Sequence, residues 1–273
     1  MKGLILLKQR VITGAALVVA LIVILILGTP VVEFAIALLA SVAVVELFSA
    51  VKLSGNKLLM VASVAGTIAL VAAQCFGAQF FNPAMYAYIV ALFIIYMINM
   101  HKFSFEEITK TFFVTMYVAF MFAHIILVRN MEYGHFLIWF VLIGAFVTDT
   151  AAMFGGKFFG KHKLCPALSP KKTVEGSIAG IAGCVVCTFI MCMICNIGFG
   201  IETNYLWAIV VALGASVISQ LGDLSASCIK RQFGIKDYGK IFPGHGGVMD
   251  RFDSLFFVAP FVYYMMLIIP ILE

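Results

Sequence analysis

The chain has 273 residues, of which 63% are hydrophobic and only 11% are charged. Because soluble domains carry about 25% charged residues, this composition excludes an ordinary soluble protein and indicates an integral membrane protein. The net charge of +5 does not require nucleic acid as a partner, since basic residues beside anionic lipid headgroups account for it.

Apolar stretches long enough to cross a bilayer recur along the whole chain. A membrane helix needs roughly 17 to 25 residues, and helices satisfy their own backbone hydrogen bonds in lipid. We therefore predict an all-α, polytopic integral membrane protein with about nine transmembrane helices. In chain order, these helices occupy residues 11–28, 31–50, 58–76, 84–100, 111–128, 135–154, 177–199, 205–222 and 255–272.

The distribution of basic residues predicts that the N-terminus lies in the cytoplasm. Cytoplasmic loops of membrane proteins are rich in Lys and Arg. With this orientation, all of the 18 Lys and Arg residues except Arg129 fall on the cytoplasmic side. The first apolar stretch is too long for a signal peptide and no small-residue cleavage site follows it, so we interpret it as an uncleaved first span.

Loop content divides the chain into two predicted regions. Residues 1–134 contain N-terminal transmembrane helices joined by short connectors, and residues 135–273 form a C-terminal transmembrane catalytic region. Two long polar loops, residues 155–176 and 223–254, belong to the second region. Because function resides mostly in loops held by a rigid scaffold, we expect the chemistry in this second region.

Ionisable side chains in or against a membrane span are costly, so each one is a candidate for function. The predicted topology places four aspartates at one depth near the cytoplasmic surface: Asp149, Asp223, Asp250 and Asp253. Carboxylates gathered at one level repel one another unless cations join them, and their hard oxygens suit Mg²⁺. The alternative is a set of separate helix caps and salt bridges. Glu46, near the same end of the second span, is a weaker candidate for the site.

Groups that suit phosphate lie between these acids. The stretch "SPKKTVEG", residues 169–176, offers two hydroxyls and two adjacent ammonium groups. Lys230 and Arg231 follow Asp223, and the glycines at 244, 246 and 247 allow the backbone to approach an anion closely. The chain has neither a P-loop nor a dinucleotide fingerprint, so a bound nucleotide would be held in another way.

The last polar stretch, from Ser227 to Asp253, resembles the signature of the phosphatidate cytidylyltransferases, also called CDP-diacylglycerol synthases. The matching positions are Ser227, Ile229, Lys230, Arg231, Lys236, Asp237, Gly239, Phe242, Pro243, His245, Gly246, Gly247, Val248, Asp250, Arg251, Phe252 and Asp253. "SPKKTVEG" resembles the upstream Ser-Pro-x-Lys-Thr-x-Glu-Gly element of the same family. Two departures are Ala226, where many members carry Glu, and Met153, near which many carry an aromatic residue.

The resemblance implies transfer of CMP from CTP to phosphatidic acid, giving CDP-diacylglycerol and pyrophosphate in phospholipid biosynthesis. It implies Mg²⁺ as cofactor, with Asp223 and Asp250 as first-choice ligands and Asp253 and Asp149 as further ligands; a two-metal site is left open. The implied catalytic residues are Lys230, Arg231, Asp250 and Asp253. The implied substrate-binding residues are Ser169, Lys171, Lys172, Thr173, Ser227, Lys236, Asp237, His245, Gly246, Gly247 and Arg251.

The reaction also implies a location, because CTP is cytoplasmic and phosphatidic acid stays in the bilayer. We expect a multi-pass protein of a bacterial inner or plasma membrane, with an active site facing the cytoplasm and a lateral opening for acyl chains. A homodimer is left open. The alternatives are another CTP-using lipid enzyme, such as a polyprenol kinase that releases CDP, and a transporter, whose acids would instead line a path at the membrane midplane.

Overall fold

The structure, a computed structural model, describes residues 2–269 and 271–272, with the backbone alone for residues 2–11. By length and composition, 8 of the described helices could span a membrane, and Ile12–Ile26 forms a shorter apolar stretch. This stretch belongs to the first predicted span, and each of the other predicted spans overlaps one of the 8 long helices. The predictions for 84–100, 177–199 and 255–272 run past the helix ends at Ile98, Gly198 and Ile268. The predicted all-α, polytopic fold is therefore confirmed.

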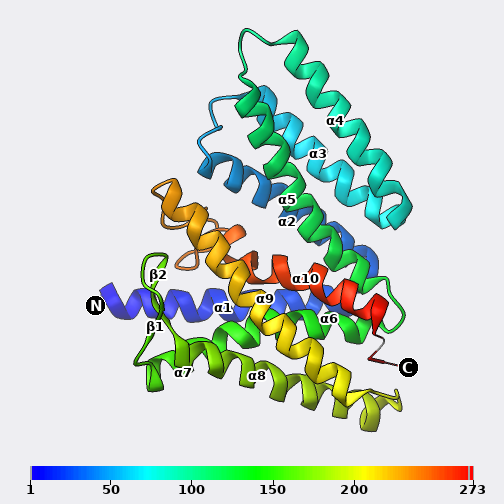
Figure 1. The fold of residues 1–273 in the computed structure, drawn as a ribbon, viewed down its shortest axis with the longest axis vertical. Coiled ribbons are helices and arrows are strands. Elements are labelled where there is room, and N and C mark those ends of the chain that lie inside the picture. The colour runs from blue at the N-terminus through cyan, green and yellow to red at the C-terminus, as the bar shows by residue number, and fades with distance from the viewer. Residues whose placement is uncertain (1, 270, 273) are drawn as a thin grey trace. The chain divides into compact units, whose positions relative to one another are not determined.

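Figure 1 labels the α-helices and the two strands, and the short segments η1, η2 and η3 lie between them in the chain. In chain order, the elements are α1 (Lys2–Ile26), α2 (Thr29–Ala50), α3 (Lys57–Phe76), η1 (Ala78–Phe80), α4 (Phe81–Ile98), α5 (Phe105–Arg129), α6 (Gly134–Leu142), η2 (Ile143–Val147), α7 (Thr148–Phe159), β1 (Lys163–Cys165), β2 (Ser169–Thr173), α8 (Val174–Met193), η3 (Ile194–Gly198), α9 (Tyr205–Gln232) and α10 (Met249–Ile268). Segments η2 and η3 are π-helical.

The chain packs as two units. Unit 1 consists of the residues up to Leu127 together with Gln232–Arg251, and unit 2 consists of Val128–Arg231 together with the chain from Phe252 onward. The loop between α9 and α10 therefore belongs to unit 1, where it packs with helices from the first half of the chain. The predicted assignment of catalysis to residues 135–273 stays a prediction.

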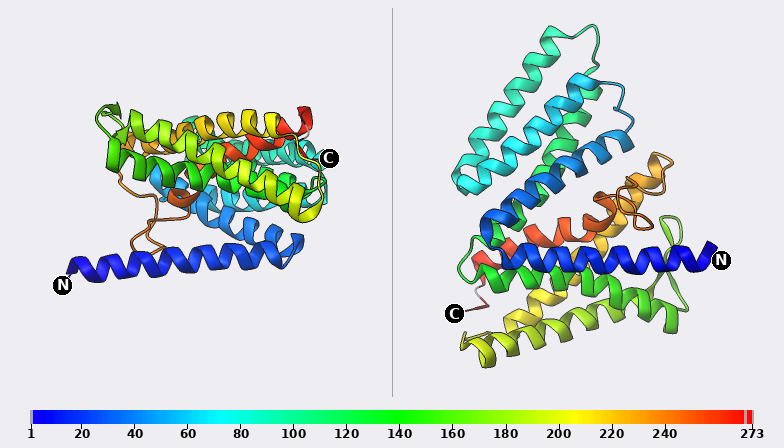
Figure 2. Two further views of the ribbon diagram at one scale, coloured as in Figure 1. Left: turned by 90° about the horizontal axis from the view of Figure 1, so that it is seen from below. Right: turned by 180° about the vertical axis from the view of Figure 1, so that it is seen from behind.

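In unit 1, the loop before α10 reaches α1, as the left view of Figure 2 shows. The His245 ring lies beside Gly14 of α1, where a Cβ atom on the glycine would be 3.7 Å from Nε2. The turn between α1 and α2 passes through Gly28, whose φ of 99° suits glycine. Pro30 follows in the first turn of α2, where its missing N–H leaves no hydrogen bond unmade.

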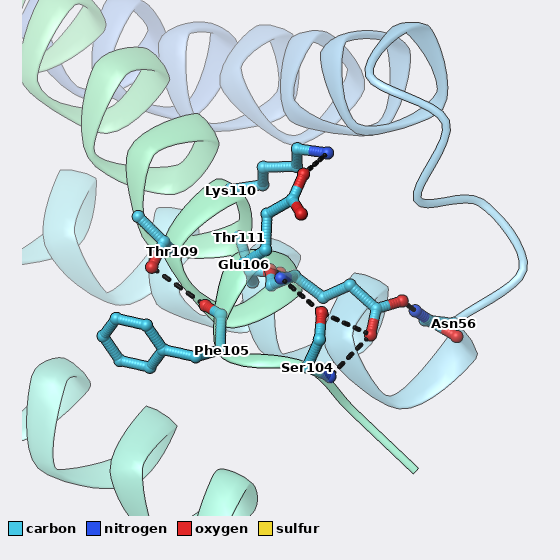
Figure 3. A network of polar contacts seen from close by, with 8 residues as sticks. Asn56, Ser104, Phe105, Glu106, Thr109, Lys110 and Thr111 are labelled. Carbon is cyan, nitrogen blue, oxygen red and sulfur yellow. Dashed lines mark hydrogen bonds and ion pairs between the residues drawn. The ribbon is translucent and has the colours of Figure 1, made fainter.

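The N-terminus of α5 is held by the capping box drawn in Figure 3. The Ser104 amide donates to Glu107 Oε2 at 2.8 Å, and the Glu107 amide donates to the Ser104 hydroxyl at 3.2 Å. Asn56, the residue before α3, donates through its side-chain amide to Glu107 Oε1. Reciprocal bonds of this kind satisfy amides that a helix start leaves unpaired, so Glu107 ties the start of α3 to that of α5.

Thr115 links three helices of unit 1 inside the protein. Its hydroxyl lies 2.6 Å from Ser63 Oγ of α3 and 2.7 Å from Tyr88 Oη of α4, and it donates to the Thr111 carbonyl of α5. Ser63 and Thr115 are completely buried. Hydrogen bonds between membrane helices contribute to their association because hydrocarbon offers no other partner.

We expect Thr115→Val to lower the free energy of unfolding by about 1 kcal/mol, because the valine keeps the volume but removes the shared hydroxyl. Unfolding of the purified protein in detergent measures the change. The matched control is Thr109→Val on the same helix, whose exposed hydroxyl bonds only the Phe105 carbonyl at 2.9 Å (Figure 3). Equal losses in both variants would show that the buried network does not stabilise unit 1.

In unit 2, α7 and α8 lie side by side (Figure 1). Their close approach depends on small residues: a Cβ atom on Gly155 would collide with Ala179, and one on Gly180 would lie 2.9 Å from the Thr148 carbonyl oxygen. Such contacts are typical of membrane helices, which associate through small residues. Between α7 and α8, strands β1 and β2 form an antiparallel hairpin in which Lys163 pairs with Thr173 and Cys165 with Ser169.

Small residues also bring α9 and α10 together within unit 2. A Cβ atom on Gly222 of α9 would lie 2.7 Å from the Asp253 carbonyl oxygen, and one on Gly214 would collide with the Phe261 ring. The backbone of α10 at Asp253 therefore lies directly against α9, one residue from Asp223.

Candidate active site

A cavity of about 350 Å³ lies in unit 2 between α7, α8, α9 and the β1–β2 hairpin. Its charged lining consists of Asp149, Lys157, Lys171, Lys172 and Asp223. The remaining lining consists of Ala152, Met153, Gly156, Leu164, Thr173, Gly176, Ser177 and Gln220. Five of the predicted site residues, namely Asp149, Lys171, Lys172, Thr173 and Asp223, thus meet in one cavity.

An ion pair crosses this cavity from the hairpin to α9. Lys172 Nζ lies 2.6 Å from Asp223 Oδ2, and the two side chains keep 23% and 28% of their surface exposed. Ser227, one helical turn after Asp223, donates its hydroxyl to Asp223 Oδ1 at 3.5 Å. The Asp223 carboxylate is therefore oriented by two neighbours while part of it still reaches the cavity.

Asp149 lies at the start of α7, immediately after the π-helical segment η2 and Thr148. Its Oδ2 accepts a hydrogen bond of 2.6 Å from the Ser254 hydroxyl of α10. π-helical turns within α-helices are frequent at functional sites because they redirect side chains. Here the turn precedes a carboxylate that lines the cavity.

Asp253 joins these two acids from α10. Only 9% of its surface is exposed, and the charges of Asp223, Lys230 and Asp149 all act on it electrostatically. We call Asp149, Asp223 and Asp253 the acidic cluster. Three buried or half-buried carboxylates this close repel one another unless positive charge balances them, and Lys172 and Lys230 supply part of that charge.

The "SPKKTVEG" stretch forms strand β2 and the start of α8. Thr173 caps α8, because its hydroxyl accepts the Gly176 amide at 3.1 Å. Glu175 accepts the backbone amides of Lys161 and His162 and lies 2.6 Å from His162 Nδ1. Glu175 therefore fixes the start of the hairpin, and the hairpin brings Lys171 and Lys172 to the cavity.

Arg231 supports the same hairpin from α9. Its Nε donates to the Leu168 carbonyl in the hairpin turn at 3.3 Å, and the residue is exposed. Ser169, in register with Cys165, is half-buried and does not line the cavity. The predicted phosphate contacts of Arg231 and Ser169 stay predictions.

The remaining signature residues form a loop in unit 1, residues 236–250, which we call the glycine loop. Asp250 is buried, and its Oδ2 accepts the amides of Tyr238 at 2.8 Å and Gly247 at 3.0 Å. Gly246 has a φ of 83°, in the region that favours glycine, and its carbonyl accepts the Phe242 amide. Lys236, Asp237 and Arg251 are exposed. Asp250 thus holds the glycine loop closed, and its predicted role as a metal ligand stays a prediction.

The oxygen donors of unit 2 can be compared with the needs of Mg²⁺. In the part of the chain that the structure describes, no three or more His, Cys, Asp or Glu side chains are arranged as a closed metal site. Mg²⁺ at phosphate-binding sites usually takes one or two carboxylates and completes its shell with water and substrate phosphates. Asp149 and Asp223 both line the cavity, so the residues fit an open site of that kind.

Three polar residues of unit 2 did not stand out in the sequence. Ser254 binds Asp149, and Ser177 of α8 donates to Gln220 of α9 at 2.5 Å inside the cavity lining. The only signal in the sequence was a hydroxyl or an amide side chain within an apolar span. Such residues are also common where membrane helices simply pack together, so they did not indicate a site.

Known proteins are similar to this chain over nearly its whole length. A sequence model described as the cytidylyltransferase family matches residues 8–269. A phosphatidate cytidylyltransferase from Bacillus subtilis (strain 168) is 32% identical over 275 residues, covering 95% of this chain and 97% of the relative. The protein of that name from Staphylococcus haemolyticus (strain JCSC1435) is 34% identical over 260 residues, covering 93% and 96%. One from Staphylococcus aureus (strain COL) is 39% identical over 166 residues, covering 60% and 61%.

Proposed function

The chain belongs to the cytidylyltransferase family, and from this premise we propose that it is a CTP-dependent nucleotidyltransferase that converts phosphatidic acid to CDP-diacylglycerol. A phosphate oxygen of phosphatidic acid would form a bond to the α-phosphorus of CTP, and the bond from this phosphorus to the bridging oxygen would break. Pyrophosphate would leave with the electron pair. The observation that carries the proposal is the cavity of unit 2, where three lysines and two aspartates lie together.

The charges of this cavity suit the difficulty of the reaction. A phosphate monoester has a second pKa near 6, so the lipid phosphate is already largely a dianionic nucleophile at neutral pH. A strong general base is then unnecessary, and the main barrier is the approach of two polyanions. Fixed positive charge aimed at the transferring and leaving phosphates lowers such a barrier. We assign this role to Lys157, Lys171 and Lys172 in the cavity. We add Lys230, whose charge acts on Asp253.

We propose that the acidic cluster holds Mg²⁺; Asp223 and Asp149, which line the cavity, would be ligands, and Asp253 would be a further one. When bound, the ion would neutralise charge on the triphosphate and on the departing pyrophosphate. Lys172 would keep the Asp223 carboxylate in place through their ion pair. Within unit 1, we propose that the glycine loop, with His245, Gly246 and Gly247, contributes to CTP binding, and that the exposed residues Lys236, Asp237 and Arg251 contact substrate.

We expect chelation to abolish product formation and added Mg²⁺ to restore it, because the acidic cluster is left with uncompensated charge without a cation. The measurement is turnover of purified protein in EDTA, followed by titration with Mg²⁺. Full activity in excess chelator would remove Mg²⁺ from the proposal while leaving the transfer reaction intact.

The reaction also predicts an orientation. CTP reaches the enzyme from the cytoplasm, and phosphatidic acid presents its headgroup at the membrane surface. We therefore propose that the site faces the cytoplasm of a bacterial cell, in agreement with the distribution of basic residues. A homodimer stays a prediction, which the mass of the purified protein in detergent would test.

One assay tests the proposed function. Purified protein is supplied with phosphatidic acid, Mg²⁺ and CTP labelled at the α-phosphate, and we expect labelled CDP-diacylglycerol and one pyrophosphate per product. Release of CDP with phosphorylation of a polyprenol would instead support the kinase. The absence of lipid product across detergents and divalent metals, from protein shown to be folded, would overturn the proposal.

A further inference from the structure

Glu46 of α2 is a buried carboxylate in unit 1, with 7% of its surface exposed. Its Oε2 accepts the amide of Met249, the first residue of α10, at 2.9 Å across 203 positions of sequence. The first amides of a helix have no partner within the helix. A carboxylate at this position satisfies one of them and interacts favourably with the helix dipole. Glu46 therefore holds the end of the glycine loop where it enters α10.

The second oxygen of Glu46 lies against the backbone of the glycine loop. A Cβ atom added to Gly239 or Gly247 would collide with Glu46 Oε1. This oxygen is buried and has no hydrogen-bond partner among the described residues. The two glycines thus leave space that the carboxylate fills, and one side chain contacts the loop near both of its ends.

Asp250 holds the same loop from within. It binds the amides of Tyr238 and Gly247, while Glu46 binds the Met249 amide. Gly247 is therefore held through its amide by Asp250 and packed on its Cα by Glu46. Two carboxylates on different helices define the shape of a loop whose glycine backbone is free of side chains.

We propose that Glu46 is a positioning residue for nucleotide binding, which acts by holding the glycine loop in the shape that accepts CTP. This inference rests on the proposed transfer reaction. It gives a function to a residue of the second helix, far in sequence from the signature. It also explains why positions 239 and 247 are glycines although neither has a φ in the region that requires glycine.

The first experiment compares Glu46→Ala with Glu46→Gln in the purified full chain. We expect Glu46→Ala to raise the KM for CTP and to lower kcat/KM for CTP by about 100-fold, because a shift of the loop by about 1 Å misplaces its ligand. The KM for phosphatidic acid should stay within about twofold. Glu46→Gln should retain activity within about fivefold, since its carbonyl oxygen can still accept the Met249 amide, although without charge.

The KM for CTP distinguishes a positioning role of Glu46 from a purely structural role. A purely structural role would lower the fraction of folded enzyme, and therefore kcat, while the KM for CTP stayed unchanged; that result would overturn the inference. The matched control is Glu33→Ala, which removes the other glutamate of α2 and should leave the KM for CTP unchanged. If the wild-type protein makes no CDP-diacylglycerol, the proposed function is wrong. If the wild-type protein is active and the Glu46 variants keep its KM for CTP, only the inference about Glu46 is wrong.

The second experiment tests the contact itself by a double-mutant cycle. Gly247→Ala alone should lower kcat/KM for CTP by about 10-fold or more, because its methyl group meets the Glu46 carboxylate. In the Glu46→Ala background, the same change should add no more than about twofold. If Glu46→Ala cannot be purified folded, Glu46→Asp replaces it, since the shorter side chain withdraws from Gly247. Additive effects would overturn the inference.

Discussion

Asp223→Asn is expected to lower CDP-diacylglycerol formation by about 1,000-fold. The substitution keeps the size of the side chain but removes its charge from the cavity, where Asp223 forms an ion pair with Lys172. It would remove one proposed carboxylate ligand of Mg²⁺ and leave Lys172 without its partner. Initial rates at saturating CTP and phosphatidic acid, measured over a range of Mg²⁺ concentrations, give the size of the loss and any weakening of metal affinity.

Glu202→Gln provides the control for this experiment. Glu202 is exposed and lies in the loop between η3 and α9, apart from the cavity lining, so its neutralisation should leave turnover unchanged. A normal unfolding transition for Asp223→Asn would assign its loss to the site. Near-normal rates in folded Asp223→Asn would contradict the assignment of the acidic cluster to catalysis.

Asp250→Asn should also lower turnover by about 1,000-fold while the protein remains folded. The Asn carbonyl oxygen can accept the amides of Tyr238 and Gly247, as Asp250 Oδ2 does, so the glycine loop should keep its shape. The variant would lose only the negative charge that the predicted metal role requires. Asp250→Ala, in contrast, removes the oxygen that accepts both amides, and we expect it to lower the free energy of unfolding by about 1–3 kcal/mol.

Comparison of the two variants separates the two roles of Asp250. A loss of activity in both, with a loss of stability only in Asp250→Ala, would support a role of the charge itself. Near-normal CTP-dependent activity in purified Asp250→Asn would remove Asp250 from the metal ligands and leave it as the residue that closes the glycine loop.

The helices were the most predictable part of the fold. Long apolar runs bounded by Gly, Pro and charged residues indicate membrane spans because a helix is the form that satisfies its backbone in lipid. The ends were less predictable: α9 continues to Gln232, ten residues beyond the predicted end at Gly222. The last turns of α9 carry Asp223, Lys230 and Arg231. Hydropathy does not predict these polar turns as part of a membrane span, so the predicted end was too early.

The β1–β2 hairpin was not predicted, and its sequence shows why. "SPKKT" has no alternation of apolar and polar residues and begins with Ser-Pro, which is typical of a turn. The conformation of the hairpin depends on tertiary contacts. Glu175 accepts the Lys161 amide at the start of the hairpin, and Arg231 donates to the Leu168 carbonyl in its turn. Long-range contacts of this kind override local propensity.

The candidate site was predicted in part. The predicted topology placed the aspartates at one depth, because their spans end at the same membrane surface. In unit 2, Asp149 and Asp223 do lie near enough to Asp253 for their charges to act on it. Hydropathy gave no means of seeing that Thr173 caps α8 or that Asp250 closes the glycine loop, because both depend on which amide lies within reach. The contact of Glu46 with Gly247 depends likewise on packing between segments separated by 200 residues.

The π-helical segment η2 has a consequence for the whole helical stretch from α6 to α7. A π-helical turn contains one residue more than an α-helical turn. If the same five residues, Ile143–Val147, had regular α-helical pitch instead, the extra residue would rotate everything after it by about 100°. Asp149 would then face away from Ser254, although the span would still be long and apolar enough to cross the membrane. The π-helical turn, rather than the hydropathy of the span, therefore sets the direction in which the Asp149 carboxylate points.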